Sequence, residues 1–186
     1  MTEDKIFKYM PSLYSYSEIE RLIGRSEAIK RLVANYRGIV EEPPIFSSNC
    51  LLIGKGSIGK TLVVFYFWRG FRRIVIEGNI KLFFEYFDCI NFRSKGSIFR
   101  ELIAKYVPLW DNRGYRLNQK LLYSKLKQDN RFIILILDEI HLLKSEEILE
   151  FLNIAKEHPN ISTLMICRTQ DWLRIKKDKF QFDEIL

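Results

Sequence analysis

The fold is decided by the stretch Leu51-Leu52-Ile53-Gly54-Lys55-Gly56-Ser57-Ile58-Gly59-Lys60-Thr61. From Gly54 onward it follows the pattern G-x-x-x-x-G-K-[ST], in which glycines let successive backbone N–H groups turn inward around phosphate oxygens. The apolar run before the loop is typical of a buried strand, and the apolar run from Leu62 to Trp68 is typical of a helix. A strand, a glycine loop and a helix in this order predict a phosphate-binding loop, with the positive end of the helix facing the anion.

Each position of this loop has an expected role if the ligand is a nucleoside triphosphate. Lys60, which we also count among the catalytic residues, can reach the β- and γ-phosphates, and the Thr61 hydroxyl can hold the accompanying Mg²⁺. We therefore expect ATP or ADP to be bound by Gly54, Lys55, Gly56, Ser57, Ile58, Gly59, Lys60, Thr61 and Leu62. The alternative is a glycine-rich turn that binds no ligand, and a second motif farther along the chain argues against it.

The second motif is an apolar run, Phe132–Leu137, that ends in the acidic pair Asp138-Glu139. Such a run is typical of a strand that is buried on both faces of a parallel sheet. Its carboxyl end would lie at the edge where α/β proteins bind their ligands. There Asp138 is expected to hold Mg²⁺, directly or through water, and Glu139 to act as the base that polarises the attacking water. The alternative is a helix N-cap made of two acids, which the pairing with the glycine loop disfavours.

The composition predicts a globular protein of the cytoplasm. The chain has 186 residues, of which 47% are hydrophobic and 28% charged, enough for one domain with a proper core. Cys50, Cys89 and Cys167 are far apart in apolar surroundings, which indicates reduced core residues. The first ten residues are too polar for a secretory signal, and no apolar run approaches the roughly 20 residues of a membrane span. We therefore expect no membrane partner.

The formal net charge is +7, and most of the excess lies in one segment, residues 95–127. That segment contains only two acids, and its eight bases are Lys95, Arg100, Lys105, Arg113, Arg116, Lys120, Lys125 and Lys127. A basic stretch of this kind permits binding to nucleic acid through phosphate contacts. The alternative is an ordinary solvated helical surface in a lysine-rich protein.

Strands and helices alternate along the chain, with long crossover connections. Residues 1–24 are expected to form an N-terminal arm, and Ser26 to cap a helix with one apolar face. Arg73–Ile76 and Tyr86–Phe92 are both strand-like, and we expect at least the second to join the sheet. Further elements are expected at Ser97–Tyr106, Leu117–Leu126 and Ser145–His158, which are helical, and at Ile161–Cys167, which is a strand. The alternation predicts a three-layer α/β/α sandwich with a mostly parallel sheet, in a domain spanning residues 25–186.

These motifs resemble the AAA+ core of the origin-recognition and replication-licensing initiator ATPases of the archaeal type, a P-loop NTPase fold. The family's adenine-covering helix start resembles Gly24-Arg25-Ser26-Glu27, which implies a nucleotide contact for Arg25. The family's acidic motif resembles Leu137-Asp138-Glu139-Ile140-His141, with His141 where members often have Asp. Its Thr-Asn-Asp resembles Thr169-Gln170-Asp171, which implies that Gln170 is the first sensor, a catalytic amide that contacts the γ-phosphate or the attacking water.

The resemblance also concerns DNA. The insertion through which these initiators touch DNA resembles Arg113-Gly114-Tyr115, which precedes a leucine-rich helix. It implies double-stranded DNA as a partner of the basic segment 95–127, and assembly with a second copy or with a full-length relative. A protein with these partners would be associated with the nucleoid.

Members of the family continue beyond the part that this chain matches. They add a helical lid with a second sensor arginine and then a winged-helix domain, for which residues 172–186 are too short. An arginine finger is expected where this chain has Lys179-Phe180-Gln181-Phe182, and Arg174 comes too early. Because such an arginine stabilises transition-state charge, we expect slow or partner-dependent ATP hydrolysis.

Three functions agree with these features. The favoured one is an ATP-binding AAA+ protein of the replication-initiator type, whose nucleotide state controls binding to DNA or to a partner. The second is a signalling or defence ATPase that acts as a switch, because such proteins also place Gly-Arg-x-Glu before the glycine loop. The third is a non-hydrolysing regulator that forms a heterodimer with a complete initiator, as the missing lid and finger suggest.

Overall fold

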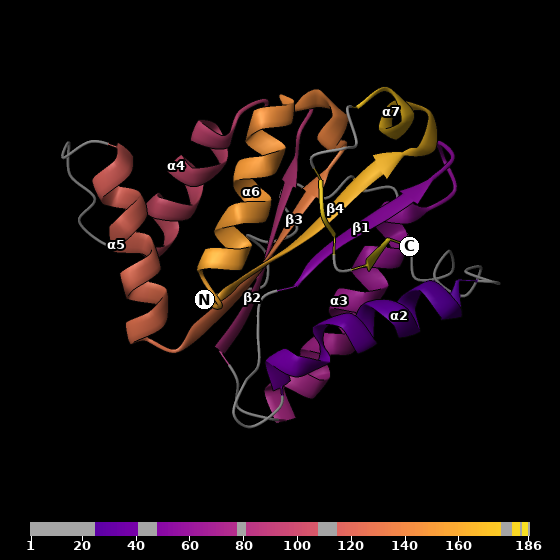
Figure 1. The fold of residues 1–186 in the computed structure, drawn as a ribbon. Helices are drawn as coiled ribbons and strands as arrows, with labels where there is room; N and C mark the ends of the chain where they lie inside the picture. The colour runs from indigo at the N-terminus through magenta and orange to yellow at the C-terminus, as the bar shows by residue number, and fades with distance from the viewer. Residues whose placement is uncertain are drawn as a thin grey trace.

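The computed structural model describes residues 25–40, 48–77, 81–107, 115–175, 180–182 and 184–185. Five parallel strands of this part of the chain form one sheet with the order β2-β3-β4-β1-β5 (Figure 1). The strands are β1 (Asn49–Gly54), β2 (Lys81–Asp88), β3 (Arg131–Asp138), β4 (Ile161–Arg168) and β5 (Glu184–Ile185). The predicted α/β fold with a mostly parallel sheet is confirmed. The order of the strands could not be predicted from the alternation of strands and helices alone.

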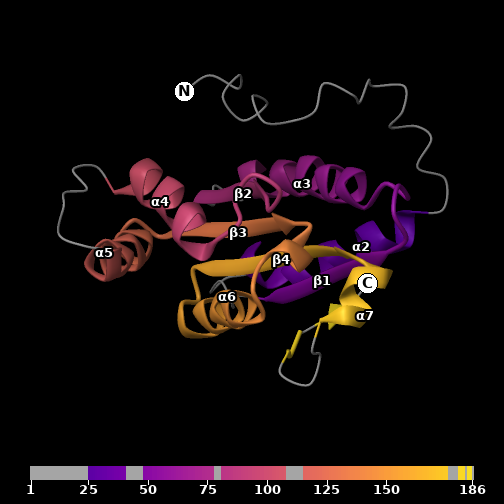
Figure 2. The same cartoon turned by 90° about the horizontal axis from the view of Figure 1, so that it is seen from above.

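Helices cover both faces of the sheet (Figure 2). One face carries α2 (Ser26–Tyr36) and α3 (Lys60–Glu77), and the other carries α4 (Lys95–Tyr106), α5 (Tyr115–Gln128) and α6 (Ser145–Glu157). The short helix α7 (Thr169–Arg174) follows β4, while the 3₁₀ helices η3 (Arg37–Val40) and η4 (Ile140–Leu142) follow α2 and β3. This arrangement is the predicted three-layer sandwich.

Strand β3 joins the two halves of the core because its side chains are apolar on both faces. Ile133, Leu135 and Leu137 belong to the buried cluster that includes α4, α5 and α6. The alternate residues Ile134 and Ile136 belong to the cluster that includes α2 and α3. Side chains of a strand alternate with a period of two, so an unbroken apolar run can fill both sides of a sheet.

The parallel arrangement brings the carboxyl ends of β1, β3 and β4 to one edge of the sheet. Gly54 at the end of β1 lies opposite Arg168 at the end of β4. Asp138 at the end of β3 lies opposite Asp88 at the end of β2. The glycine loop follows β1 and the acidic pair ends β3, so the two sequence motifs meet at the edge where such folds bind ligands.

The structure corrects both strand assignments between the glycine loop and the acidic strand. Arg73–Ile76 is strand-like in sequence but forms part of the last turns of α3. Continuation of the helix outweighs the weak β-propensity of branched residues. Strand β2 ends at Asp88 and does not continue to Phe92. The Asp88 carboxylate accepts the Ile90 N–H at 2.9 Å and its carbonyl accepts the Asn91 N–H at 3.0 Å, which turns the chain.

Helix starts also differ slightly from the prediction. Arg25, not Ser26, occupies the cap position of α2, and its side chain makes no capping hydrogen bond. Helix α4 is capped by Ser94, whose hydroxyl accepts the Ser97 N–H at 3.2 Å. Ser145 is the first residue of α6 and not its cap. Neighbouring polar residues compete for a cap, so sequence places it only to within a few residues.

The three cysteines are buried and free, as the sequence predicts. Burial and, to a smaller extent, nearby carboxylates raise the pKa of the Cys89 and Cys167 thiols to about 12. These thiols therefore stay protonated at neutral pH and serve as small core side chains.

Some predicted features lie outside the described residues. They include the arm of residues 1–24 with Gly24, the Arg113-Gly114 pair of the insertion, and Lys179 of the finger stretch. Within the described ranges, no helix has the length and apolar character needed to cross a membrane.

Candidate nucleotide-binding site

The loop between β1 and α3 has the backbone of a phosphate cradle. Gly59 has φ +82° and Ser57 has φ 59°, and both left-handed conformations help to curl the chain at the start of α3. A side chain on Gly54 would collide with the side chain of Ile58. Consecutive turns of this kind direct backbone N–H groups into a concave space that suits an anion. Glycine is thus required at Gly59 by the backbone, while a side chain at Gly54 would force Ile58 to move.

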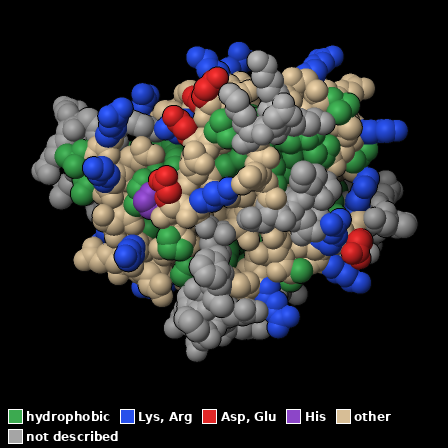
Figure 3. All heavy atoms as spheres, viewed as in Figure 1, with side chains coloured by type: hydrophobic (Ala, Val, Ile, Leu, Met, Phe, Trp, Pro, Cys, Tyr) green, Lys and Arg blue, Asp and Glu red, His purple; other side chains and the backbone are tan. Residues whose placement is uncertain are grey.

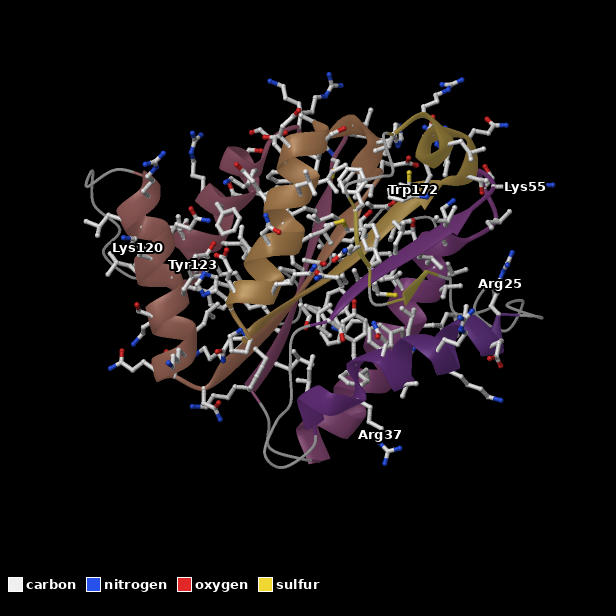
Figure 4. All side chains as sticks on the ribbon, in the orientation of Figure 1. Arg25, Arg37, Lys55, Lys120, Tyr123 and Trp172 are labelled. Atoms are coloured by element: carbon white, nitrogen blue, oxygen red, sulfur yellow. The ribbon has the colours of Figure 1, made fainter. Side chains whose placement is uncertain are left out.

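The Lys60 ammonium lies across the same loop. Its Nζ donates to the carbonyl oxygen of Gly54 at 3.1 Å and to that of Lys55 at 2.9 Å. Helix α3 begins at Lys60, and the first N–H groups of a helix lack partners within it. An anion in the loop would meet both the ammonium and the helix end. The Lys55 side chain, by contrast, points outward from the molecule (Figure 4).

Arg25 connects α2 to the loop. Its guanidinium donates to the carbonyl oxygen of Ile58 at 3.0 Å, although the two residues are 33 positions apart. This contact fixes the start of α2 beside the phosphate cradle (Figure 4). A contact between Arg25 and the nucleotide itself stays a prediction.

Asp138 is the meeting point of the two motifs. Its Oδ2 accepts a hydrogen bond from the Thr61 hydroxyl at 2.6 Å and one from the Tyr86 hydroxyl at 3.1 Å. Its Oδ1 accepts the backbone N–H of Glu139 at 2.9 Å. The residue is 6% exposed, so it relies on these three donors in place of water. The sequence analysis did not single out Tyr86.

Burial raises the pKa of the Asp138 carboxyl above its usual range. Hydrogen bonds from Thr61, Tyr86 and Glu139 lower the pKa and offset burial only in part, and the Asp88 charge raises it again. The pKa of the Tyr86 phenol is also raised, chiefly by burial and then by the Asp138 charge. A buried carboxylate beside a hydroxyl is an oxygen donor set that suits a hard divalent cation. The residues present therefore fit Mg²⁺ at Thr61 and Asp138.

The raised pKa gives a prediction for Asp138→Asn. A carboxyl whose pKa rises on folding stabilises the protein fully below its unfolded pKa, near about 3.9, and that contribution is lost as the pH rises through the folded pKa. We expect the metal-free variant to be as stable as the wild type at neutral pH, or more stable by about 1 kcal/mol. Urea unfolding of both proteins in EDTA, from the unfolded pKa of Asp up to neutral pH, measures the difference between their free energies of unfolding. A variant clearly less stable than the wild type at neutral pH would contradict the expectation.

Glu139 has an unusual backbone conformation next to this site. Its φ of 55° and ψ of 46° lie in the left-handed region, which residues with a side chain rarely adopt. Its Oε2 lies 3.2 Å from His141 Nδ1 and 3.3 Å from Arg168 Nε. The same oxygen is buried and makes no hydrogen bond of good geometry to the described residues. A strained backbone and a free acceptor are features of functional positions and agree with the expected base.

Arg168 lies at the centre of a charged group that includes Glu139. Its Nε is 2.8 Å from Asp171 Oδ2, and a terminal nitrogen is 3.3 Å from His141 Nε2. The group combines two carboxylates, one imidazole and one guanidinium in the space beside the end of β3. Arg168 is not among the site residues predicted from the sequence. The signal that could have found it is its position, directly after the apolar run of β4.

Gln170, the predicted first sensor, is not one of the residues of the charged group around Arg168. It lies in the first turn of α7 and is exposed. No hydrogen bond connects it to Glu139 or to the other described residues of the site. Its catalytic role stays a prediction, and the structure brings Arg168 to Glu139 instead.

Within the described residues of the basic segment, 95–107 and 115–127, several of the cations are paired with acids. Three of its lysines are paired with acids: Lys95 with Glu150, Lys105 with Glu85, and Lys125 with Asp129. The exposed face of α5 keeps Arg116, Lys120 and Lys127, together with Leu117 and Leu121, which are 42% and 38% exposed. In the space-filling view, Lys and Arg side chains are scattered around the rim, and several lie over α5 (Figure 3). The surface open to a polyanion is therefore narrower than the net charge suggests.

The sheet order and the motifs at its carboxyl edge define an α/β fold with a phosphate-binding loop, and that fold is shared with ORC proteins of known structure. No family model matches the chain. It is 25% identical over 144 residues to the ORC1-type DNA replication protein 2 of Sulfolobus acidocaldarius, a match that covers 75% of this chain and 35% of that protein. The chain is homologous to the archaeal ORC1/Cdc6 replication initiators, over their AAA+ core.

Solved structures share the fold. The Aeropyrum pernix ORC2 protein in ADPNP and ADP complexes has a TM-score of 0.73 at 17% identity, covering 89% of this chain and 48% of that one. The Aeropyrum pernix ORC1 protein in complex with DNA has a TM-score of 0.67 at 18% identity, covering 87% of this chain and 44% of that one. The chain thus spans about a third of the curated relative and less than half of these two structures.

Proposed function

We propose that this chain is an ATP-binding module of the replication-initiator type, in which the bound nucleotide controls binding to DNA or to a protein partner. The observation that carries the proposal is the 2.6 Å hydrogen bond between the Thr61 hydroxyl and Asp138. It joins the glycine loop to the acidic strand end across 77 positions of sequence. That structures of similar fold hold ADPNP, ADP or DNA supports both halves of the proposal.

The residues of the site divide the chemistry between them. Lys60 and the first turn of α3 hold the phosphates, and Thr61 and Asp138 hold Mg²⁺. The metal supplies charge neutralisation at the β- and γ-phosphates. Glu139 holds the attacking water through Oε2, which makes no hydrogen bond of good geometry to the described residues, and accepts its proton. Burial at the end of β3 keeps bulk water away from Asp138, which strengthens every charge interaction there.

Hydrolysis is slow in this proposal unless a partner contributes a cation. Arg174 on α7 is 82% exposed and lies 3.8 Å from Asp171, not against the glycine loop. An arginine supplied from outside can raise phosphoryl-transfer rates by roughly 10³ or more. The second candidate function, a regulator that does not hydrolyse ATP, rests on this same observation. Steady phosphate release from the pure chain would exclude it.

The DNA-binding half of the proposal rests on the exposed face of α5. Arg116, Lys120 and Lys127 lie on that face and form no ion pair with the described acids, whereas Lys95, Lys105 and Lys125 each have one. Helix α5 lies at the opposite side of the molecule from the glycine loop, as the positions of Lys120 and Lys55 show (Figure 4). Nucleotide control of DNA binding would therefore act through assembly or through movement of the elements between the two sites.

The double substitution Arg116→Ala/Lys120→Ala is expected to weaken binding to duplex DNA. Each lost phosphate contact removes about 0.9 from the slope of log K against log salt, so the slope should fall by about two and the affinity at low salt by about tenfold. Fluorescence anisotropy of a labelled duplex, with MgATP, with MgADP and without nucleotide, measures both quantities and the nucleotide effect.

The matched control is Lys30→Ala/Lys144→Ala, which removes two exposed charges from other elements. An equal loss in both variants would show a general effect of net charge and would contradict a DNA site on α5. Failure of the wild type to bind DNA at low salt with MgATP would remove the DNA-binding half of the proposal altogether.

A further inference from the structure

Arg168 is placed where a terminal phosphate would be read. It is the last residue of β4 and lies opposite Gly54, the first glycine of the loop. A Cβ atom built on Gly56 would have the Cδ of Arg168 at 3.8 Å. The side chain therefore runs alongside the loop from the same edge of the sheet. Arginine presents five N–H donors in a planar fork, which matches phosphate oxygens.

The guanidinium of Arg168 contacts two carboxylates and one imidazole, which a bound phosphate would have to replace. Its Nε lies between Asp171, at 2.8 Å, and Glu139, at 3.3 Å. A terminal nitrogen faces His141 Nε2 at 3.3 Å. The side chain is 46% exposed, so part of the guanidinium is open to a new acceptor that enters from solvent. A phosphate group carries more charge than either carboxylate and accepts two donors at once.

A shift of Arg168 toward phosphate would also change Glu139. The Oε2 atom of Glu139 has Arg168 and His141 as its charged neighbours and no hydrogen bond of good geometry among the described residues. Moving the guanidinium toward a phosphate would therefore take one of these two neighbours away from the oxygen.

We propose that Arg168 contacts the terminal phosphate of bound ATP and so distinguishes ATP from ADP, releasing Glu139 as it does. The inference rests on the proposed function, because it needs a nucleotide in the glycine loop. It assigns to Arg168 the reading of the terminal phosphate that the sequence pattern places on Gln170.

The test compares the affinities for MgATP and MgADP in Arg168→Ala, Arg168→Lys and Gln170→Ala, the last of which changes the residue that the family resemblance proposes for the same contact. Loss of a charge-assisted contact to the third phosphate should weaken ATP binding roughly 10- to 100-fold and leave ADP binding within about twofold. Arg168→Lys keeps the charge but loses the planar fork of donors, so its ATP affinity should lie between those of the wild type and of Arg168→Ala. Gln170→Ala should keep the wild-type ratio of the two affinities.

A purely structural role predicts a different pattern. If Arg168 only anchors α7 through Asp171, then Asp171→Asn should reproduce the effect of Arg168→Ala on stability and on both nucleotides. An unchanged ratio in Arg168→Ala and Arg168→Lys, with wild-type nucleotide binding intact, would overturn the inference alone. Loss of the ratio in Gln170→Ala but not in Arg168→Ala would do the same. A wild type that binds neither nucleotide would overturn the proposed function as well.

Discussion

Lys60→Ala is expected to weaken ATP binding by at least about 10²-fold, because the site loses charge-assisted hydrogen bonds to the β- and γ-phosphates. The ammonium already lies across the loop, 3.1 Å and 2.9 Å from two of its carbonyl oxygens. It would exchange these neutral acceptors for charged ones when phosphate enters. Equilibrium binding of a fluorescent ATP analogue measures the change. The folded state should be nearly unaffected, since the residue is partly exposed and at the first position of α3.

Lys55→Ala is the matched control for this experiment. It removes the same charge from the same loop, but its side chain points outward (Figure 4). We expect a change of no more than about threefold, the size of an exposed and screened charge effect. Equal losses in the two variants would show that only the general positive charge of the loop matters. Unchanged affinity in Lys60→Ala would remove the phosphate-loop interpretation.

Glu139→Gln is expected to stop hydrolysis while keeping nucleotide bound. The amide has nearly the shape of the carboxylate but cannot accept a proton, and loss of a general base costs roughly 10²- to 10⁴-fold in rate. The free Oε2 atom of Glu139 is the acceptor that the substitution removes. Phosphate release at saturating MgATP, alone and after mixing with a full-length relative, measures the effect.

Glu146→Gln serves as its control, because Glu146 is an exposed acid in the first turn of α6. This variant should keep the wild-type rate. If Glu139→Gln also keeps it, the base is another residue, and the expected division between Asp138 and Glu139 is wrong. If the wild type releases no phosphate even with a partner, the non-hydrolysing regulator becomes the better account.

The parts of this site that lie on single short motifs could be placed from the sequence. Gly54 to Thr61 form the loop at the end of β1, and Asp138 ends β3, because each is set by neighbouring residues and by an apolar run of strand length. That the two motifs meet follows from a parallel sheet, whose carboxyl ends share an edge.

Tyr86 could not be predicted because its role depends on strand boundaries. Taking Tyr86–Phe92 as a strand puts Tyr86 at the amino end, far from the ligand edge. In the structure β2 covers Lys81–Asp88, so Tyr86 is near the carboxyl end and reaches Asp138 on the neighbouring strand. The predicted bounds run too far along the chain because the hydrogen bonds of Asp88 to the N–H groups of Ile90 and Asn91 turn the chain and end the strand.

Arg168 and Gln170 show a similar limit. The resemblance of Thr169-Gln170-Asp171 to the family's Thr-Asn-Asp implies that Gln170 is the sensor, and the predicted strand before it ends at Cys167. The strand continues for one more residue, so Arg168 is still paired with β1 while α7 begins at Thr169. A shift of one residue changes which side chain points at the glycine loop. Only the register between β1 and β4 shows that the strand ends at Arg168 and not at Cys167.

The central claim is that the glycine loop and the acidic strand end together hold a magnesium nucleotide. Its most direct test is calorimetric titration of the wild-type chain with MgATP, repeated with ATP in EDTA. The account predicts one site per chain with a dissociation constant of about 1 µM or below, corresponding to about −8 kcal/mol or tighter, and weaker binding without the metal. Absence of saturable binding in both titrations would contradict it.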